Sequence, residues 1–86
     1  MKNYKALINI TLRKGILDVQ GKAVENALHS IEFEMITGVR IGKHVELEIE
    51  ADNEINAEEI VTDSCKKLIA NPIIEDFVIE IIELNN

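Results

Sequence analysis

The side chains best suited to chemistry in this sequence are one cysteine and two histidines. Cys65 has no second cysteine to complete a C-x-x-C pair, and it falls among the apolar positions of a helical pattern. We therefore expect a small core residue in preference to a reactive thiol. His29 and His44 stand on different predicted elements at a separation that matches no metal-ligand spacing, so we expect both to be solvated.

Carboxylates and glycines give no stronger signal for catalysis. Glu46, Glu48 and Glu50 alternate along one predicted strand face without an apolar wall to raise a pKa, which disfavours acid–base catalysis. The four glycines compose neither a dinucleotide-binding fingerprint nor a P-loop. Three aromatic residues are too few for a platform on which bases could stack. No self-contained active site is visible, and the residues favour a binding or assembly module.

The length and net charge of the chain narrow the possible class of protein further. The chain has 86 residues, 47% of them apolar, and a net charge of −7, which predicts a single domain over residues 1–86 with its core at about 4–84. That charge disfavours nucleic acid and anionic membrane surfaces as partners. A single cysteine suits a reducing compartment, and no apolar run is long enough to cross a membrane, so we expect a cytoplasmic protein.

Hydrophobic periodicity predicts six elements that would position these residues. Residues 4–12 alternate as a half-buried strand, and residues 20–31 carry a helical stripe with Asp18 as the N-cap. Gly21, in the first turn of that helix, indicates the close approach of another backbone. Strands follow at 35–41 and 45–50, then a helix at 57–68 capped by Asn56, with Asn53 or Asp52 as alternatives, and a strand at 75–84.

This order, β-α-β-β-α-β, predicts an α+β ferredoxin-like sandwich: a four-stranded antiparallel sheet with two helices on one face. Parity of the apolar residues predicts a hairpin in which Ile41 lies opposite Val45 and Val39 opposite Leu47, joined by residues 42–44. Three apolar residues on the second face of the last strand predict a contact with another subunit, tolerated surface aliphatics being the alternative. They are Val78, Ile82 and Leu84.

Three short clusters carry a family resemblance. They are Leu17-Asp18-Val19-Gln20-Gly21-Lys22-Ala23-Val24, Val39-Arg40-Ile41-Gly42-Lys43, and residues 65–76, Cys-Lys-Lys-Leu-Ile-Ala-Asn-Pro-Ile-Ile-Glu-Asp. In this order and spacing the chain resembles the PurS family over about residues 4–83. Two departures occur: Val19 stands where the family usually has Pro, and Glu32 where it often has Gly. A Pro at that position would pre-set the helix's first turn, so Val19 is expected to loosen the loop slightly.

The resemblance implies a non-catalytic subunit of phosphoribosylformylglycinamidine synthase, a ligase complex of purine biosynthesis. The complex would convert formylglycinamide ribonucleotide to formylglycinamidine ribonucleotide with ATP and glutamine. This chain would join a PurQ-type glutaminase to a PurL-type synthetase, form a homodimer or a dimer of dimers, and assist ammonia transfer. It would bind no cofactor itself, since ATP, Mg²⁺ and glutamine would be used by its partners.

Residues of the three clusters are the expected partner interface. Arg40 and Lys43 would stand about a hairpin tip and offer donors to a partner, although a solvated turn charge explains them equally well. The expected interface residues are Asp18, Gln20, Gly21, Arg40, Gly42, Lys43, Asn71 and Glu75. The competing hypothesis is a stand-alone regulatory domain that binds a small molecule on a ferredoxin-like scaffold.

Overall fold

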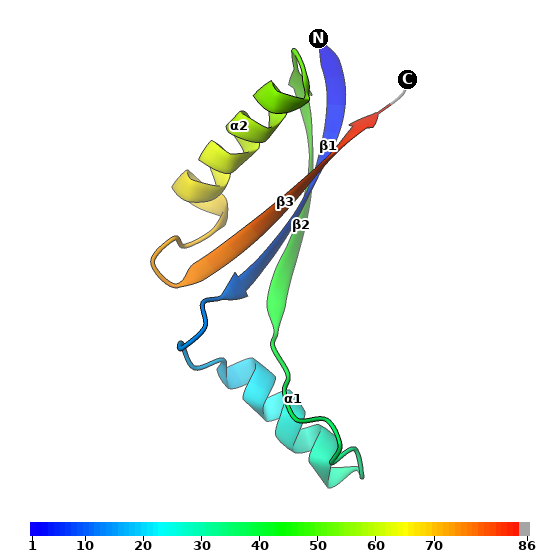
Figure 1. The fold of residues 1–86 in the computed structure, drawn as a ribbon, viewed down its shortest axis with the longest axis vertical. Coiled ribbons are helices and arrows are strands. Elements are labelled where there is room, and N and C mark those ends of the chain that lie inside the picture. Colours follow the sequence, from blue (N-terminus) through cyan, green and yellow to red (C-terminus); the bar gives the residue numbers. More distant parts are fainter. Residues whose placement is uncertain (85–86) are drawn as a thin grey trace.

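The computed structural model describes residues 1–84 and contains three strands and two α-helices, the second extended by a π-helical turn (Figure 1). In chain order the elements are β1 (Lys2–Leu12), α1 (Val19–Ser30), β2 (Gly42–Ala51), α2 (Glu54–Ser64), the π-helical turn η1 (Cys65–Ile69) and β3 (Glu75–Leu84). No helix within residues 1–84 has the length and apolar character needed to cross a membrane.

The sheet is antiparallel, and its order is β2-β1-β3, so the first strand lies in the middle. Ala6 stands opposite Leu47 on β2 and Ile81 on β3. The next core position, Ile8, stands opposite Val45 and Ile79. The alternation predicted for the first strand is confirmed, because Tyr4, Ala6, Ile8 and Ile10 are buried and the residues between them are not.

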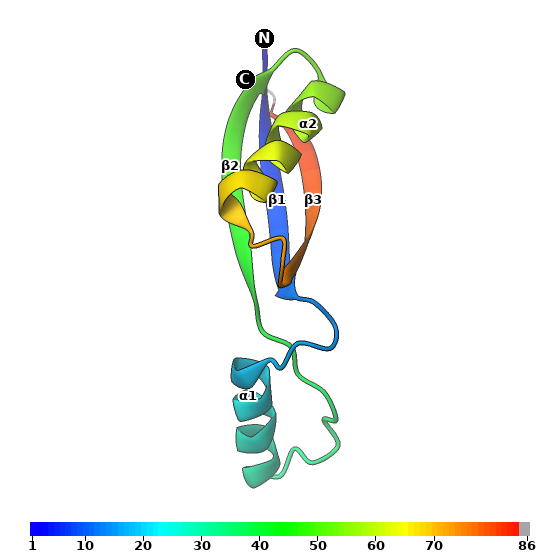
Figure 2. The same ribbon diagram turned by 90° about the vertical axis from the view of Figure 1, so that its left-hand side faces the viewer.

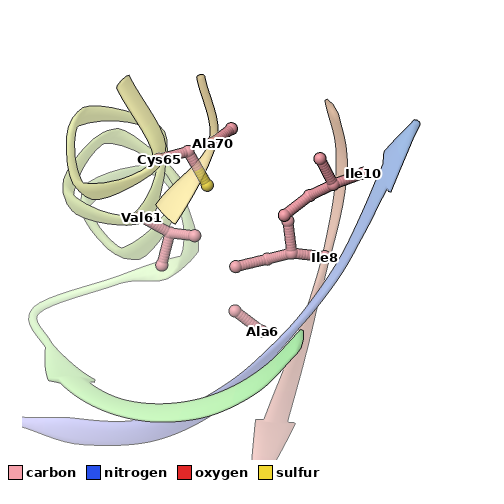
Figure 3. Packing of buried hydrophobic residues seen from close by; sticks show 6 residues of the cluster. All are labelled: Ala6, Ile8, Ile10, Val61, Cys65 and Ala70. Carbon is pink, nitrogen blue, oxygen red and sulfur yellow. The ribbon is translucent and has the colours of Figure 1, made fainter. Parts of the chain in front are cut away.

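Helix α2 covers one face of this sheet and closes the core (Figures 2 and 3). Val61 and Cys65 point toward Ala6, Ile8 and Ile10 of β1. Cys65 is fully buried, and burial raises the pKa of its thiol, which confirms the predicted core role. The N-cap is Asn53, whose side chain accepts from the Asn56 amide at 2.8 Å, so the preference for Asn56 as the cap was wrong.

The prediction of a fourth strand over residues 35–41 is wrong. Glu32 adopts a left-handed backbone conformation with φ 76°, and the chain turns back beside α1. The Phe33 amide donates to the Leu28 carbonyl at 2.9 Å, and His29 Nε2 lies 2.6 Å from the Ile36 carbonyl oxygen. A strand needs a hydrogen-bonding neighbour, and this segment pairs with none of the three described strands, because residues 42–44, which the predicted hairpin needed as its turn, are instead extended in β2 opposite β1.

The predicted hairpin is therefore absent as well. Residues 42–44 are not a connection but the beginning of β2, which pairs with β1 over its whole length. Val45 and Leu47 keep their predicted face, yet they lie opposite Ile8 and Ala6 of β1 instead of Ile41 and Val39. The alternation of apolar residues correctly predicted which face of β2 is buried, but it could not predict which strand pairs with β2.

Helix α1 lies beyond the end of the sheet and does not cover its face (Figures 1 and 2), so the prediction of two helices on one face is wrong. Its apolar stripe is left open: 39% of Val24 and 61% of Ile31 remain exposed. The radius of gyration is 16.7 Å, against about 12 Å for a compact chain of this length. The described chain is thus elongated, and one of its two amphipathic helices has no apolar surface to pack on.

Candidate functional site

Asp18 joins the two connections that lead from the sheet to α1. Its carboxylate Oδ1 accepts from the Gly21 amide at 2.9 Å, which confirms the predicted N-cap. Its Oδ2 accepts from the Ile41 amide at 2.7 Å, on the segment that returns from α1 to β2. The Gly21 bond, followed by the Ile41 bond, holds the pKa of Asp18 below its ordinary value; partial burial opposes this shift and Arg40 adds to it.

Gly21 is buried at the crossing of these two connections. A Cβ atom built there would lie 2.5 Å from Oδ2 of Asp18 and closer still to the carbonyl oxygen of Val39. No side chain fits without displacing the carboxylate or the backbone. The predicted close approach of another backbone at this glycine is confirmed, and the approaching residue is Val39.

Asp18, Gly21, Val39 and Ile41 form a junction between the two connections. A hollow of about 340 Å³ opens beside this junction, between the end of β1 and the beginnings of α1, β2 and β3. Apolar residues, among them Leu12 and Leu17, form part of its wall. Five of the eight predicted interface residues line it: Asp18, Gln20, Gly42, Lys43 and Glu75. The structure thus brings together three clusters that lie far apart in the sequence.

Glu75 anchors the third cluster to the other two. Its Oε2 lies 3.5 Å from Nζ of Lys43, and its Oε1 accepts a hydrogen bond from the backbone amide of Asn71 at 2.7 Å. Only 14% of the Glu75 side chain is exposed, whereas 60% of the Lys43 side chain is. The carboxylate is therefore held inside the junction, and the ammonium group stands at its surface.

Arg40 and Lys43 do not stand at a hairpin tip, so that prediction is wrong. The Arg40 guanidinium donates to the Leu12 carbonyl at the end of β1, and Lys43 lies within β2 opposite Ile10. The partners that the sequence did not reveal are backbone groups, the Ile41 amide and the Leu12 carbonyl. No residue-type signal could have shown them, since every residue except proline carries both groups.

The chemistry of this junction is that of contact and recognition. Within residues 1–84 no three His, Cys, Asp or Glu side chains are grouped to hold a metal ion. His29 contacts the carbonyl oxygen of Ile36. His44 contacts the side chain of Asn9, which is 35 residues away in the chain but lies opposite it on the sheet. A small α+β module with an open apolar helix and a polar junction has the features of an assembly subunit, the class of protein that acts within a larger complex.

Comparison with known proteins names the family. The family model described as PurS, phosphoribosylformylglycinamidine (FGAM) synthase, matches residues 5–83. The PurS subunit of Bacillus subtilis is 42% identical over 82 residues, covering 94% of this chain and 95% of that one. The PurS subunit of Methanocaldococcus jannaschii is 37% identical over 78 residues, covering 91% and 94% respectively.

Solved structures agree with the sequence comparison. The M. jannaschii PurS crystal structure matches with a TM-score of 0.86 at 35% identity, covering 95% of this chain and 99% of that one. A chain of the PurLQS structure from Thermotoga maritima matches with a TM-score of 0.84 at 33% identity, covering 98% and 100%. The chain belongs to the PurS family and is a subunit of phosphoribosylformylglycinamidine synthase, a ligase complex of purine biosynthesis.

Proposed function

We propose that this chain joins a PurQ-type glutaminase to a PurL-type synthetase without taking part in the chemistry. The observation that carries the proposal is the convergence of the three sequence clusters on one exposed junction that offers recognition groups and no catalytic constellation. The near-complete overlap with a chain of PurLQS supports it. In this role the partner subunits bind glutamine, ATP and Mg²⁺, and this chain binds no cofactor. The complex acts in the cytoplasm.

The junction is proposed as a partner contact because its carboxylate is held in place. Glu75 accepts from the backbone amide of Asn71 and pairs with Lys43 at the surface, which lowers the side-chain entropy that Lys43 loses on binding. The apolar wall near Leu12 and Leu17 adds area that a partner could bury, since 73% of Leu17 is exposed.

Self-association is part of the same proposal. The stripe carries Val24 on α1 and Ile31 at its C-cap, 39% and 61% exposed. Fully burying an exposed aliphatic side chain stabilises by about 1.5–3 kcal/mol, so covering the exposed parts of these two contributes a fraction of that for each. A second copy could supply the cover that the chain's own sheet does not. The earlier expectation, a contact through Val78, Ile82 and Leu84, stays a prediction, but carboxylates around those residues weigh against it because two copies would bring like charges together.

Reconstitution tests the proposal. The chain is mixed with the glutaminase and synthetase subunits of the same organism, and product formation is measured with glutamine and, separately, with ammonium chloride. Assembly and ammonia transfer both predict a loss of the glutamine-dependent rate when the chain is omitted, with a smaller loss of the ammonium-dependent rate. Equal glutamine-dependent rates together with no co-elution would refute the proposal.

Two alanine variants locate the contact. Lys43→Ala removes the junction's exposed ammonium, and co-elution with the partner subunits is expected to weaken. Lys67→Ala is the matched control: Lys67 is 76% exposed and pairs with Asp63 at 3.0 Å, but it lies on η1 away from the junction. Equal effects of the two variants would remove the junction from the proposal.

Two lysine variants locate the self-contact. Val24→Lys is expected to lower the mass measured by sedimentation, because it places a charge in the α1 stripe. Ile82→Lys tests the earlier expectation in the same assay. A lowered mass for Ile82→Lys alone would move the self-contact from α1 to the sheet.

A further inference from the structure

The open face is the side of the sheet that α2 does not cover. Pairing places its side chains in register across three strands: Leu7 of β1 lies between Glu46 of β2 and Glu80 of β3, and Lys5 lies between Glu48 and Ile82. On the β2 side runs an acid column, Glu46, Glu48 and Glu50. On the β3 side runs an apolar column, Val78, Ile82 and Leu84, which Glu80 interrupts between Val78 and Ile82.

The acid column is not neutralised by its own chain. Lys5 Nζ lies 3.4 Å from Oε1 of Glu46, and His44 Nε2 lies 3.0 Å from Oε2 of the same residue. These two contacts, His44 first, lower the pKa of Glu46. The Lys5 ammonium and the His44 ring are thus both directed at Glu46, and within residues 1–84 no ion pair involves Glu48, Glu50 or Glu80.

The apolar column is open on the same face. Val78 is 69% exposed and Ile82 is 38% exposed, and Leu7 on the central strand extends the apolar surface toward the acids. Neighbouring strands lie about 4.8 Å apart, so the two columns stand about 10 Å from each other across β1. That separation equals the diameter of an α-helix with its side chains, about 10 Å.

We propose that the open face docks a basic amphipathic segment of another protein, with its apolar side chains on the β3 column and its Lys or Arg side chains on the β2 column. Charge complementarity selects this occupant. On the face formed by the two columns with Lys5 and Glu80, four carboxylates and one ammonium leave a net charge of −3.

The same charge rejects the other occupants of such a face. A second copy would bring two sets of carboxylates together, and like charges at an interface cost free energy. Nucleic acid and anionic lipid are repelled for the same reason. The inference depends on the proposed function only in placing the basic segment on one of the other two subunits.

Charge reversal on the acid column tests the inference. Glu48→Lys/Glu50→Lys changes the two carboxylates of the acid column that make no ion pair, and Glu58→Lys/Glu59→Lys makes the same charge change on exposed positions of α2. Binding of the glutaminase and synthetase subunits is measured at 50 and 300 mM NaCl. We expect the first pair to weaken one of these affinities at least tenfold at low salt and the second pair to change both less than twofold.

A second probe keeps the inference testable by itself. A synthetic 18-residue peptide, with Leu on one face of its helix and Lys on the other, is titrated against wild type and the same variants. The backbone amide resonances of the protein are recorded during the titration. Shifts at Lys5, Leu7 and Ile82, lost in Glu48→Lys/Glu50→Lys and kept in Glu58→Lys/Glu59→Lys, are expected. The neutral variant Glu48→Gln/Glu50→Gln should lose part of the binding, which separates charge from misfolding.

The outcomes of the two arms are distinguishable. If complexes form equally well with both charge-reversed pairs, the inference is wrong and the proposed function stands. If the wild-type chain binds neither subunit, the proposed function fails, and the peptide titration alone decides the inference. Equal peptide binding by the two charge-reversed pairs of variants then overturns the inference. A changed sedimentation mass confined to the acid-column variants would identify a second copy as the occupant and overturn it too.

Discussion

Replacing Gly21 by alanine tests the packing of the junction most directly. The added Cβ would lie 2.5 Å from Oδ2 of Asp18, about 1 Å inside the separation of about 3.5 Å at which non-bonded heavy atoms attract. Either the carboxylate leaves the Ile41 amide or the Val39 backbone moves, since both confine the space. Overpacking of this kind costs about 1–3 kcal/mol. The higher helix propensity of alanine returns at most about 1 kcal/mol.

The net expectation for Gly21→Ala is a loss of about 1–2 kcal/mol in the free energy of unfolding. For a domain of this size, 1 kcal/mol corresponds to about 4–8 °C in Tm, so we expect Tm to fall by about 5–15 °C. Thermal unfolding followed by circular dichroism measures it, with protein concentration held fixed because self-association would also shift Tm. The Ile41 amide resonance should move in the same variant.

Gly38→Ala is the matched control for this experiment. A Cβ at Gly38 would meet no atom within 4 Å, and its φ does not lie in the left-handed region, so alanine fits. Its Tm is expected to stay the same or rise, because alanine restricts the unfolded chain. A Gly21→Ala variant as stable as wild type, with the Ile41 resonance unmoved, would show that the junction has room and would refute the reasoning.

Further predictions concern the same junction and the core. Asp18→Asn should lower Tm at pH 7, because the folded state stabilises the Asp18 carboxylate and so lowers its pKa below the ordinary 3.8. The difference in Tm between the variant and wild type should stay constant above pH 3.8. It should shrink as the pH falls through the lowered pKa, because the wild-type carboxylate is then protonated too. A deficit that is the same at pH 3 and pH 7 would exclude the carboxylate as its source. Ile8→Val should cost about 0.5–1.5 kcal/mol and Ile8→Ala about 2–5 kcal/mol in urea unfolding, since Ile8 has no exposed surface. Cys65 should react with a thiol reagent only after denaturant is added, because it is fully buried; rapid labelling of the native protein would contradict its core position.

Local rules were enough where one chain segment sets its own pattern. The alternation of residues 4–12 identified the buried face of β1, and Asp18 was recognised as a cap because a carboxylate satisfies the free amides of a helix's first turn. Cys65 was placed correctly from its position on an amphipathic stripe. Each of these results depends on side chains a few residues apart.

Pattern failed where two segments compete for one neighbour. Val39 and Ile41 alternate with polar residues as a strand should, but periodicity reports a preferred face and not a hydrogen-bonding partner. Pairing with β1 keeps residues 42–44 extended in β2, so the turn that would fold residues 35–41 back beside β2 does not form, and this segment stays outside the sheet. The clusters of the junction were recognised individually by resemblance, yet their meeting at Asp18, Lys43 and Glu75 depends on that strand order.

The sequence by itself determined which residues face the core, where α1 begins, and the family to which the chain belongs, because these follow from local chemistry and from residue identities. The tertiary structure decided that the sheet has three strands, that α1 lies beyond its end with an open apolar stripe, and that the acid and apolar columns share one face. The physical reason is that strand pairing is chosen by competition among segments distant in the chain, and each strand edge can accept one neighbour.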